Sequence, residues 1–386
     1  GKKVTRDDQN KLVKYSGWGS TELAQGMFPP NQYRIKEGWS DLSSELKETL
    51  SESDWHEARK STLYAHYTPK PVIENMYKAL DQFGFEGGKI LDPGAGTGHF
   101  QGMMPNEMSK KSQYTGFELD PTSAKIAQAL YPDSNFKEAD FTKTQLPKDY
   151  FDLAIGNPPY DQLTIKTDPE YRAERFKIHD YFAAKSIDRV RPGGIMAVVI
   201  SKGTMDKKST QARDYIADRA DLIAAIRLPE TTFKKNAGTQ TVTDILFLQK
   251  REVGQEAAGE KWRDVVDINS DESPVKYGNF KFPGNVKVNE YFKNHPEHVI
   301  GNFEMDSGRF GPELTVKFDG NLDQKLSEVI SKLPKNIYTK STDKTPDLSF
   351  NNDDELQRTA DKISFSENRK PGAYFIKDDE LYAVNE

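Results

Sequence analysis

The feature that most constrains this chain is a regular alternation of short apolar segments and amphipathic segments between residues 61 and 250. The apolar segments have the length of buried strands, and the segments between them have the 3.6-residue spacing of helices. Strands are predicted at 89–92, 114–118, 151–155, 195–200, 222–226 and 245–249, and helices at 71–83, 121–130, 181–190 and 210–219. This alternation predicts an α/β fold with helices on both faces of a mostly parallel sheet. Ligands of such folds bind beyond the carboxyl ends of the strands.

The regions before residue 61 and after residue 250 lack this alternation and are predicted to be separate domains. Residues 1–60 read as a polar, helical extension, in which Ser51 and Asp54 have the spacing of a helix N-cap. Residues 251–386 form an accessory region whose role the sequence leaves open. Within it, residues 340–370 have the composition of a flexible segment, and residues 374–384 have the pattern of a hairpin. The chain begins with Gly1 rather than Met and is expected to be part of a longer polypeptide.

Composition excludes several kinds of chemistry. There is no cysteine, so disulfides, thiolate catalysis and cysteine-ligated zinc are excluded, and a reducing cytoplasm is the expected location. The six histidines include no HxxxH or HxH pair, so no dedicated metal site is expected. No run of about 18 apolar residues predicts a transmembrane helix. The formal net charge of -6 argues against holding nucleic acid by bulk charge, but it leaves a locally basic cleft open.

A glycine-rich loop follows the first predicted strand and indicates a nucleotide-like ligand. Asp92 ends the strand, and the loop then contains Gly94, Gly96, Gly98 and Phe100. Alternate glycines let the backbone approach a ligand closely because no Cβ stands in the way. The spacing is GxGxG rather than the GxGxxG that brings a helix N-terminus onto a pyrophosphate. The loop therefore suits S-adenosylmethionine, which has no phosphate, better than a dinucleotide. The structural alternative is a tight turn without a ligand.

Two acidic residues are candidates for contacts with the same cofactor. Glu118 ends the next strand, twenty residues after Gly98, and an acid there can accept both ribose hydroxyls of an adenosine-containing molecule. Asp140 ends the third segment and is expected to face the adenine ring. Aspartate in such a position is also a common helix cap, so that interpretation of Asp140 stays open.

The apolar strand at 151–155 leads into Asn157-Pro158-Pro159-Tyr160, which predicts methylation of an amino group. The two prolines fix φ and remove two backbone donors, so that carbonyl groups point outward. The Asn157 side-chain oxygen and the carbonyl after it can accept both hydrogens of one amino group. Positioning and electrostatics then favour attack of the nitrogen on a sulfonium methyl group. Tyr160 offers an aromatic face to a base flipped out of DNA. The competing interpretation is a proline-rich strand exit without chemistry.

Residues 60–250 resemble the amino-group (N6-adenine) DNA methyltransferases of the gamma motif order. The resemblance implies a Rossmann-like class I methyltransferase fold with S-adenosylmethionine as cofactor and DNA as partner. His66, Tyr67 and Thr68 match the leading motif, which helps to hold the methionine end of the cofactor. Residues 92–100, 118 and 140 match the cofactor motifs, and residues 157–160 match the catalytic tetrapeptide. Phe233, in the terminal hairpin, is the candidate for covering the second face of the base, and a core position is the alternative.

More narrowly, residues 15–19, 61–68 and 290–301 are similar to the methylase region of large phage and plasmid antirestriction proteins. Those proteins join a methyltransferase to a helicase. This sequence lacks helicase motifs such as GxxxxGK[ST], so a helicase is expected only as a partner or as a further domain of a longer polypeptide.

Basic residues on either side of the predicted pocket are candidates for phosphate contacts, which position DNA without reading its sequence. They are Lys202, Lys207, Lys208, Lys234, Lys235, Lys250 and Arg251, with Arg172, Arg175 and Lys177 in the loop after the tetrapeptide. Two further functions stay open. The same tetrapeptide methylates protein glutamine or RNA bases in other enzymes, and a non-catalytic module could bind and protect DNA.

Overall fold

The computed structural model describes residues 4–15, 26–28, 38–61, 67–234, 241–308, 311–341, 374–377 and 380–383. The chain divides into two units, one made of residues 1–144 and 149–343 and the other of residues 145–148 and 344–386. In the second unit, β14 (Tyr374–Lys377) pairs antiparallel with β15 (Glu380–Ala383), which confirms the predicted hairpin. The predicted flexible segment lies outside the described residues from residue 342 onward.

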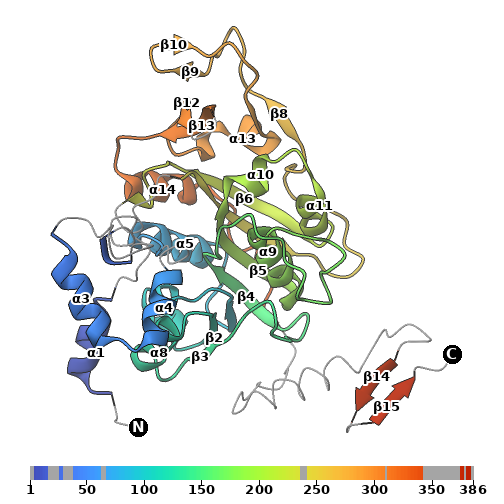
Figure 1. The fold of residues 1–386 in the computed structure, drawn as a ribbon. Coiled ribbons are helices and arrows are strands. Elements are labelled where there is room, and N and C mark those ends of the chain that lie inside the picture. The colour runs from blue at the N-terminus through green and yellow to red at the C-terminus, as the bar shows by residue number, and fades with distance from the viewer. Residues whose placement is uncertain are drawn as a thin grey trace. The chain divides into compact units, whose positions relative to one another are not determined.

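The first unit is built around a seven-stranded sheet with the order β3-β2-β1-β4-β5-β7-β6 (Figure 1). Its strands are β1 (Lys89–Asp92), β2 (Gln113–Glu118), β3 (Asn135–Glu138), β4 (Phe151–Gly156), β5 (Val190–Ser201), β6 (Ala220–Leu228) and β7 (Thr243–Lys250). Only β7 runs antiparallel to its neighbours among these strands, so the prediction of a mostly parallel sheet is confirmed. Ile90 of β1 lies opposite Tyr114 on one side and Leu153 on the other.

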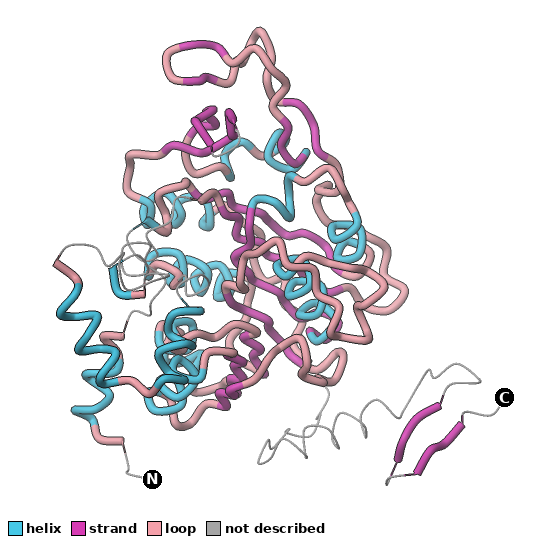
Figure 2. The backbone as a smooth tube through the Cα atoms, viewed as in Figure 1, coloured by secondary structure: helices cyan, strands magenta, loops and turns pink. Residues whose placement is uncertain are grey.

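Helices cover both faces of this sheet, as Figures 1 and 2 show. They include α5 (Lys70–Gln82), α6 (His99–Gly102), α7 (Asn106–Ser109), α8 (Pro121–Leu130), α9 (Ile178–Arg189), α10 (Lys202–Asp206), α11 (Gln211–Ala217) and α14 (Leu322–Ser331). Side chains alternate along β5 because successive residues of a strand point to opposite faces. Ile195, Ala197 and Val199 join the main core, to which α5 and α14 also contribute. Helix α9 packs against β4 and β5, and α11 packs against α9 and β6. The two buried faces explain why the strands read as continuous apolar runs.

In the described part of the N-terminal extension, the structure shows α1 (Arg6–Leu12), α3 (Ser40–Thr49) and α4 (Glu52–Ser61). Ser51 accepts the Asp54 N–H bond at 3.1 Å, so the predicted N-cap is present at α4. A small apolar cluster, which includes Phe28 and Trp55 with ring centroids 4.8 Å apart, holds this region together. None of the helices in the described part of the chain is long and apolar enough to cross a membrane.

The described residues after 250 add short strands and three helical segments, α14 among them, to the first unit. The strands are β8 (Val265–Asp267), β9 (Lys276–Tyr277), β10 (Phe280–Lys281), β11 (Lys287–Asn289), β12 (Asn302–Gly308) and β13 (Gly311–Lys317). Helix α13 (Glu290–Asn294) leads into the 3-10 turn η2 (Pro296–His298). This region lies along the outer edge of β6, where Glu260 N–H donates to the Leu222 carbonyl at 3.1 Å and Ile300 N–H to the Arg227 carbonyl at 2.9 Å.

Candidate active site

A cavity of about 360 Å³ lies at the carboxyl ends of β1, β2 and β4. It is the place where ligands are expected in an open α/β sheet. Its lining includes residues from each cofactor motif and from the tetrapeptide: Tyr67, Thr68, Gly94, Gly96, Phe100, Glu118, Asp140, Asn157 and Pro159. Apolar side chains, among them Phe117, Phe141 and Phe182, form much of the remaining wall. The fold therefore gathers segments that are far apart in the sequence around one space.

The backbone N–H groups of the glycine loop donate hydrogen bonds to acceptors within the protein. Gly94 donates to Asp92 Oδ1 (3.2 Å), Ala95 to the Phe117 carbonyl (2.9 Å), Gly96 to Glu118 Oε2 (2.8 Å) and Gly98 to the Ala95 carbonyl (2.9 Å). In dinucleotide-binding folds, the amides at this turn bind phosphate oxygens. These four amides already have acceptors, so the loop is poorly suited to a pyrophosphate.

Asp92 and Gly98 shape the loop without lining the cavity. Asp92 is fully buried and also accepts the Tyr114 hydroxyl at 2.6 Å. Burial raises the pKa of Asp92 to about 7, against the lowering effect of its two hydrogen bonds. Gly98 has φ +82°, and a Cβ there would lie 2.7 Å from the Tyr131 ring. Both residues therefore fix the conformation of the glycine loop and do not face the cavity.

Glu118 joins the end of β2 to the glycine loop. One carboxylate oxygen accepts the Gly96 N–H and the other accepts the Asp120 N–H, both at 2.8 Å. Burial raises the pKa of Glu118, and the backbone hydrogen bonds act in the opposite direction. Each oxygen keeps a second lone pair that can accept a bond from a ligand. The side chain lines the cavity and is held in one position there.

The leading motif reaches the same cavity through Tyr67 and Thr68, which are both buried. The Tyr67 ring lies 4.7 Å from the His99 ring, and its hydroxyl lies 3.4 Å from Ser123 Oγ. The third residue of this motif, His66, lies outside the described residues.

Tyr15, from the N-terminal extension, is a neighbour of the cavity that the sequence did not identify. Burial raises the pKa of the Tyr15 hydroxyl, and the charges of Asp120 and Glu118 raise it further, while a hydrogen bond with Ser123 lowers it. In the sequence, Tyr15 stood out only as part of the segment 15–19 that is similar to antirestriction proteins. The structure brings it close to cavity-lining residues, and no local pattern signals that approach.

Asp140 combines the two interpretations that the sequence left open. It lines the cavity, and its Oδ1 accepts the Thr142 N–H bond at 2.9 Å as a turn-capping aspartate does. Lys143 lies 3.5 Å from its other oxygen. The cap fixes the side chain at the rim of the cavity.

The tetrapeptide lies directly against the glycine loop. A Cβ added to Gly94 would be 3.7 Å from Pro158 Cα and 3.8 Å from the Asn157 carbonyl oxygen, which is ordinary van der Waals contact. Asn157 and Pro159 both line the cavity. Tyr160 is half-buried and does not line it; its hydroxyl donates a hydrogen bond to Asn157 Oδ1. In this conformation the Asn157 amide oxygen therefore holds a tyrosine proton in the position predicted for a substrate amino group.

Phe233 does not occupy the position predicted for a base-covering aromatic. It is 1% exposed and belongs to the main hydrophobic core, and it does not line the cavity. The segment that follows it, residues 235–240, lies outside the described residues. The alternative, a core position, describes Phe233 in this structure, because packing on the sheet buries the ring.

Lys250 and Arg251 are not part of a DNA-binding rim. Lys250 is the last residue of β7 and Arg251 follows it. Both lie at the edge of the sheet opposite the cavity, because Lys250 pairs with Ala220 at the start of β6. Lys250 pairs with Asp149 at 2.6 Å, and Arg251 pairs with Asp221 at 2.7 Å. These partly buried ion pairs stabilise the fold and correct the prediction of phosphate contacts.

Other candidates for phosphate contacts also have partners within the chain. Lys202 binds Glu313 at 2.7 Å, Lys207 binds Asp180, and Lys177 donates to the Gln162 carbonyl at 2.6 Å. Arg172 donates to the Lys166 carbonyl, and the backbone of Arg175 is left-handed, with φ +52°. Of the remaining candidates, Lys208 and Lys234 are exposed, and Lys235 lies outside the described residues. Phosphate contacts from the paired lysines would first require these internal bonds to break.

The fold and the site together define the class of protein. A seven-stranded sheet with one antiparallel strand carries a glycine loop that closes on the acid at the end of β2. The Asn-Pro-Pro-Tyr tetrapeptide follows β4 and lies beside that loop. This combination is a Rossmann-like class I methyltransferase.

The chain belongs to the N-6 DNA Methylase family, whose model matches residues 52–281. The resemblance inferred from the sequence motifs is thereby confirmed.

Two curated relatives are similar over much of this chain. Defense against restriction protein B of Escherichia phage P1 is 28% identical over 265 residues, which is 67% of this chain and 11% of that protein. Type II methyltransferase M.CvrRI of Paramecium bursaria Chlorella virus XZ-6E is 30% identical over 223 residues, 56% of this chain and 55% of the relative. The chain thus spans about a tenth of the first relative and about half of the second.

Among solved structures, the type I restriction-modification methyltransferase subunit from Streptococcus thermophilus aligns with a TM-score of 0.41 at 18% identity. The alignment covers 57% of this chain and 55% of that one.

Proposed function

We propose that this chain transfers a methyl group from S-adenosylmethionine to the N6 amino group of an adenine in DNA. The observation that carries this proposal is the contact between the tetrapeptide and the cofactor loop, which puts Asn157 and Gly94 on one cavity wall. An amino group held by Asn157 would lie next to whatever the loop binds. Family membership supports the same reaction.

The residues around the cavity fit S-adenosylmethionine better than a phosphate-bearing cofactor. The four loop amides have internal acceptors, and the cavity is lined by the carboxyl groups of Glu118, Asp120 and Asp140. Carboxylates repel phosphate but accept hydrogen bonds from ribose hydroxyls and an ammonium group. Glu118 would hold the ribose, Asp140 the adenine side, and Tyr67 with Thr68 the methionine end. The bound cofactor supplies an electrophilic methyl group on a sulfonium sulfur.

Asn157 and Pro158 would act on the substrate by accepting hydrogen bonds. The Asn157 side-chain oxygen and the Pro158 carbonyl would take the two hydrogens of the amino group, which localises the nitrogen lone pair. Acceptors fixed before the reaction stabilise the positive charge that develops on this nitrogen. The apolar walls at Phe141 and Phe182 limit water around it. These groups supply positioning and electrostatics without a side-chain base.

Tyr160 must change its hydrogen bond before an amino group can use Asn157. In the present conformation its hydroxyl donates to the oxygen that the substrate needs. Exchange of one donor for another keeps the buried oxygen satisfied, so the net cost is small. Rotation of the ring toward the cavity would also offer its face to a flipped base.

Replacement of Tyr160 separates these two contributions. In Tyr160→Phe the competing hydroxyl is gone and the ring remains, so we expect kcat within about threefold and an unchanged or lower KM for DNA, since a net hydrogen bond contributes about 1 kcal/mol. Tyr160→Ala also loses the stacking surface, so kcat/KM should fall roughly ten- to hundredfold. Steady-state kinetics with one duplex measures both. Equal losses in the two variants would mean that the hydroxyl itself is required.

Glu118→Ala should weaken the cofactor. The carboxylate offers two charged acceptors, and hydrogen bonds to charged groups contribute about 1.5–3 kcal/mol each, so the Kd should rise roughly ten- to hundredfold or more. Isothermal titration calorimetry with S-adenosylmethionine measures the change. Glu107→Ala, on an exposed part of α7, is the matched control and should bind normally. A wild-type Kd in Glu118→Ala would remove this residue from the cofactor site.

The substrate is tested by offering three acceptors at equal concentration. Random-sequence duplex DNA, RNA of the same composition and a glutamine-containing peptide are incubated with labelled cofactor, and products are identified by mass spectrometry. We expect N6-methyldeoxyadenosine from the DNA. A label found only in RNA or in peptide would replace the proposed substrate. Cofactor binding without transfer to any of them would favour a non-catalytic DNA-binding module.

A further inference from the structure

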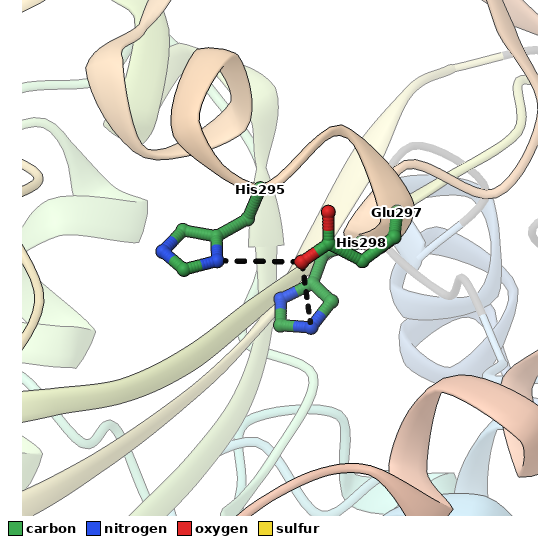
Figure 3. Close-up of side chains that lie close together, drawn as sticks. All are labelled: His295, Glu297 and His298. Atoms are coloured by element: carbon green, nitrogen blue, oxygen red, sulfur yellow. Dashed lines mark ion pairs between the residues drawn. The ribbon is translucent and has the colours of Figure 1, made fainter.

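A second cluster of polar side chains lies far along the sheet from the cavity, beside the edge strand β6. It consists of His295, Glu297 and His298, at the turn between α13 and β12. Their candidate ligand atoms all lie within 4.8 Å of one another. Figure 3 shows both imidazole rings directed toward the carboxylate of Glu297. HxxxH and HxH pairs are absent from the sequence, so no metal site was expected; these two histidines are three residues apart, in the spacing HxxH.

The distances within the cluster differ from those of ordinary hydrogen bonds. His295 Nδ1 lies 3.4 Å and His298 Nε2 lies 3.9 Å from the same oxygen, Glu297 Oε1. Protein N–H···O bonds are shorter, at about 2.7–3.2 Å. Two ligands each bound at about 2.1 Å in a tetrahedral site lie about 3.4 Å from each other. The three side chains therefore have nearly the spacing of ligands around one ion, and small side-chain rotations would close the remaining gap.

Each imidazole has a second nitrogen, and a neighbouring residue orients it. His298 Nδ1 lies 2.7 Å from the hydroxyl of Tyr291, which is 1% exposed. His295 Nε2 lies 3.2 Å from Glu260, and the His295 ring stacks on Tyr291 with centroids 4.5 Å apart. Metal-binding histidines characteristically use their other nitrogen in this way, because the partner fixes the tautomer and the ring orientation. These contacts fix the orientation of both imidazole rings, which an exposed ion pair does not need.

The surroundings leave room and charge for a cation. The cluster borders a hollow of about 280 Å³ that is also lined by Glu328, Lys325 and Lys332. Both lysines pair with Glu328, at 3.1 and 3.2 Å. The hollow is lined by Glu260, Glu297 and Glu328, so its carboxylates outnumber its two lysines. Glu297 is 54% exposed, which lets water complete the coordination.

We propose that His295, Glu297 and His298 bind one divalent transition-metal ion, with Zn²⁺ as the expected ion. Two imidazoles and one carboxylate are a known zinc ligand set, and imidazole favours this part of the transition series. The position beside β6, away from the glycine loop and the tetrapeptide, separates this ion from the proposed methyl-transfer site. The ion would link the turn at η2 to the segment around Glu260 through the His295–Glu260 contact.

The test uses the full chain without a polyhistidine tag, stripped with a chelator and then titrated with Co²⁺ and with Zn²⁺. We expect one Co²⁺ per chain with the visible absorption of a low-coordinate nitrogen and oxygen site, displaced by one equivalent of Zn²⁺. Glu297→Gln and His295→Ala should each weaken binding by more than tenfold. Tyr291→Phe, which removes only the orienting hydroxyl, should weaken it about tenfold.

Two control variants decide whether the binding is specific. His56→Ala removes an exposed histidine of α4, and Glu107→Gln removes an exposed carboxylate of α7; both should bind metal like the wild type. Circular dichroism and the Kd for S-adenosylmethionine should be unchanged in all variants, which separates loss of the metal from loss of the fold. The proposal is overturned if the wild type takes up no stoichiometric metal, or if the controls lose it as much as Glu297→Gln does.

Discussion

Replacing Asn157 with alanine should slow methyl transfer severely and leave the cofactor bound. Asn157 lines the cavity beside Gly94, and the substitution removes its carboxamide group. Loss of one preorganised hydrogen-bonding group that acts on developing charge lowers kcat by roughly 10²–10³-fold. Single-turnover methylation of a duplex measures the rate, and calorimetry with S-adenosylmethionine measures binding, which should change less than threefold.

Two variants control this experiment. Asn106→Ala removes the same side chain from the exposed end of α7 and should keep wild-type activity. Asn157→Asp keeps an oxygen acceptor and should retain more activity than the alanine variant. A wild-type rate for Asn157→Ala would show that the tetrapeptide does not hold the amino group.

Asp244→Ala should be the most destabilising of the substitutions considered, with a loss of about 3–5 kcal/mol in the free energy of unfolding. Asp244 is fully buried and accepts two bonds from Arg227, at 2.8 and 2.9 Å. Arg227 is itself 1% exposed, with its guanidinium 4.2 Å from the Phe292 ring. Removing the aspartate leaves a buried cation with only Asp206, at 2.6 Å, as a charged partner. Urea unfolding followed by circular dichroism measures the loss.

The matched control is the exposed pair between Arg263 and Asp218, at 2.7 Å. Asp218→Ala should cost no more than about 1 kcal/mol, since exposed ion pairs contribute little. The double variant Arg227→Met with Asp244→Leu should recover part of the stability, because no unpaired buried cation remains. Recovery is incomplete because Asp206, whose side chain is 15% exposed, loses its partner Arg227. If Asp244→Ala were as mild as Asp218→Ala, the buried network would not carry the stability assigned to it.

Local pattern was enough to predict most of the sheet and the helices. β1 has the predicted bounds because an apolar run stands between glycines and a polar end. β3 was not assigned as a strand, since in Asn135–Glu138 only Phe136 is buried and the strand lies at the edge of the sheet. Edge strands bury fewer residues, so hydrophobic pattern identifies them poorly.

Some residues of the candidate site were likewise predictable from the sequence, and others were not. Spacing along the chain located the glycine loop, Glu118 and Asn157, because strand ends of a parallel sheet meet at one edge. For Phe233 the sequence left a core position open beside a base-covering one, because the core that surrounds it is built from remote segments. Lys250 was misjudged because its partners, Asp149 and Asp188, are also remote in sequence. The orientation of His298 by Tyr291 and of His295 by Glu260 depends on similar contacts, which no periodicity encodes.

The bonds that residues 260 and 300 make to β6 have a consequence for handling the protein. An edge strand with unpaired N–H and C=O groups is a template on which other chains can add as strands. Here Glu260 and Ile300 donate to two of those carbonyls, and the buried Trp262 belongs to the same covering segment. A shortened methyltransferase that stopped after Lys250 would leave this edge bare. Such a fragment would be prone to self-association and inclusion-body formation, even though its cofactor loop and tetrapeptide were intact.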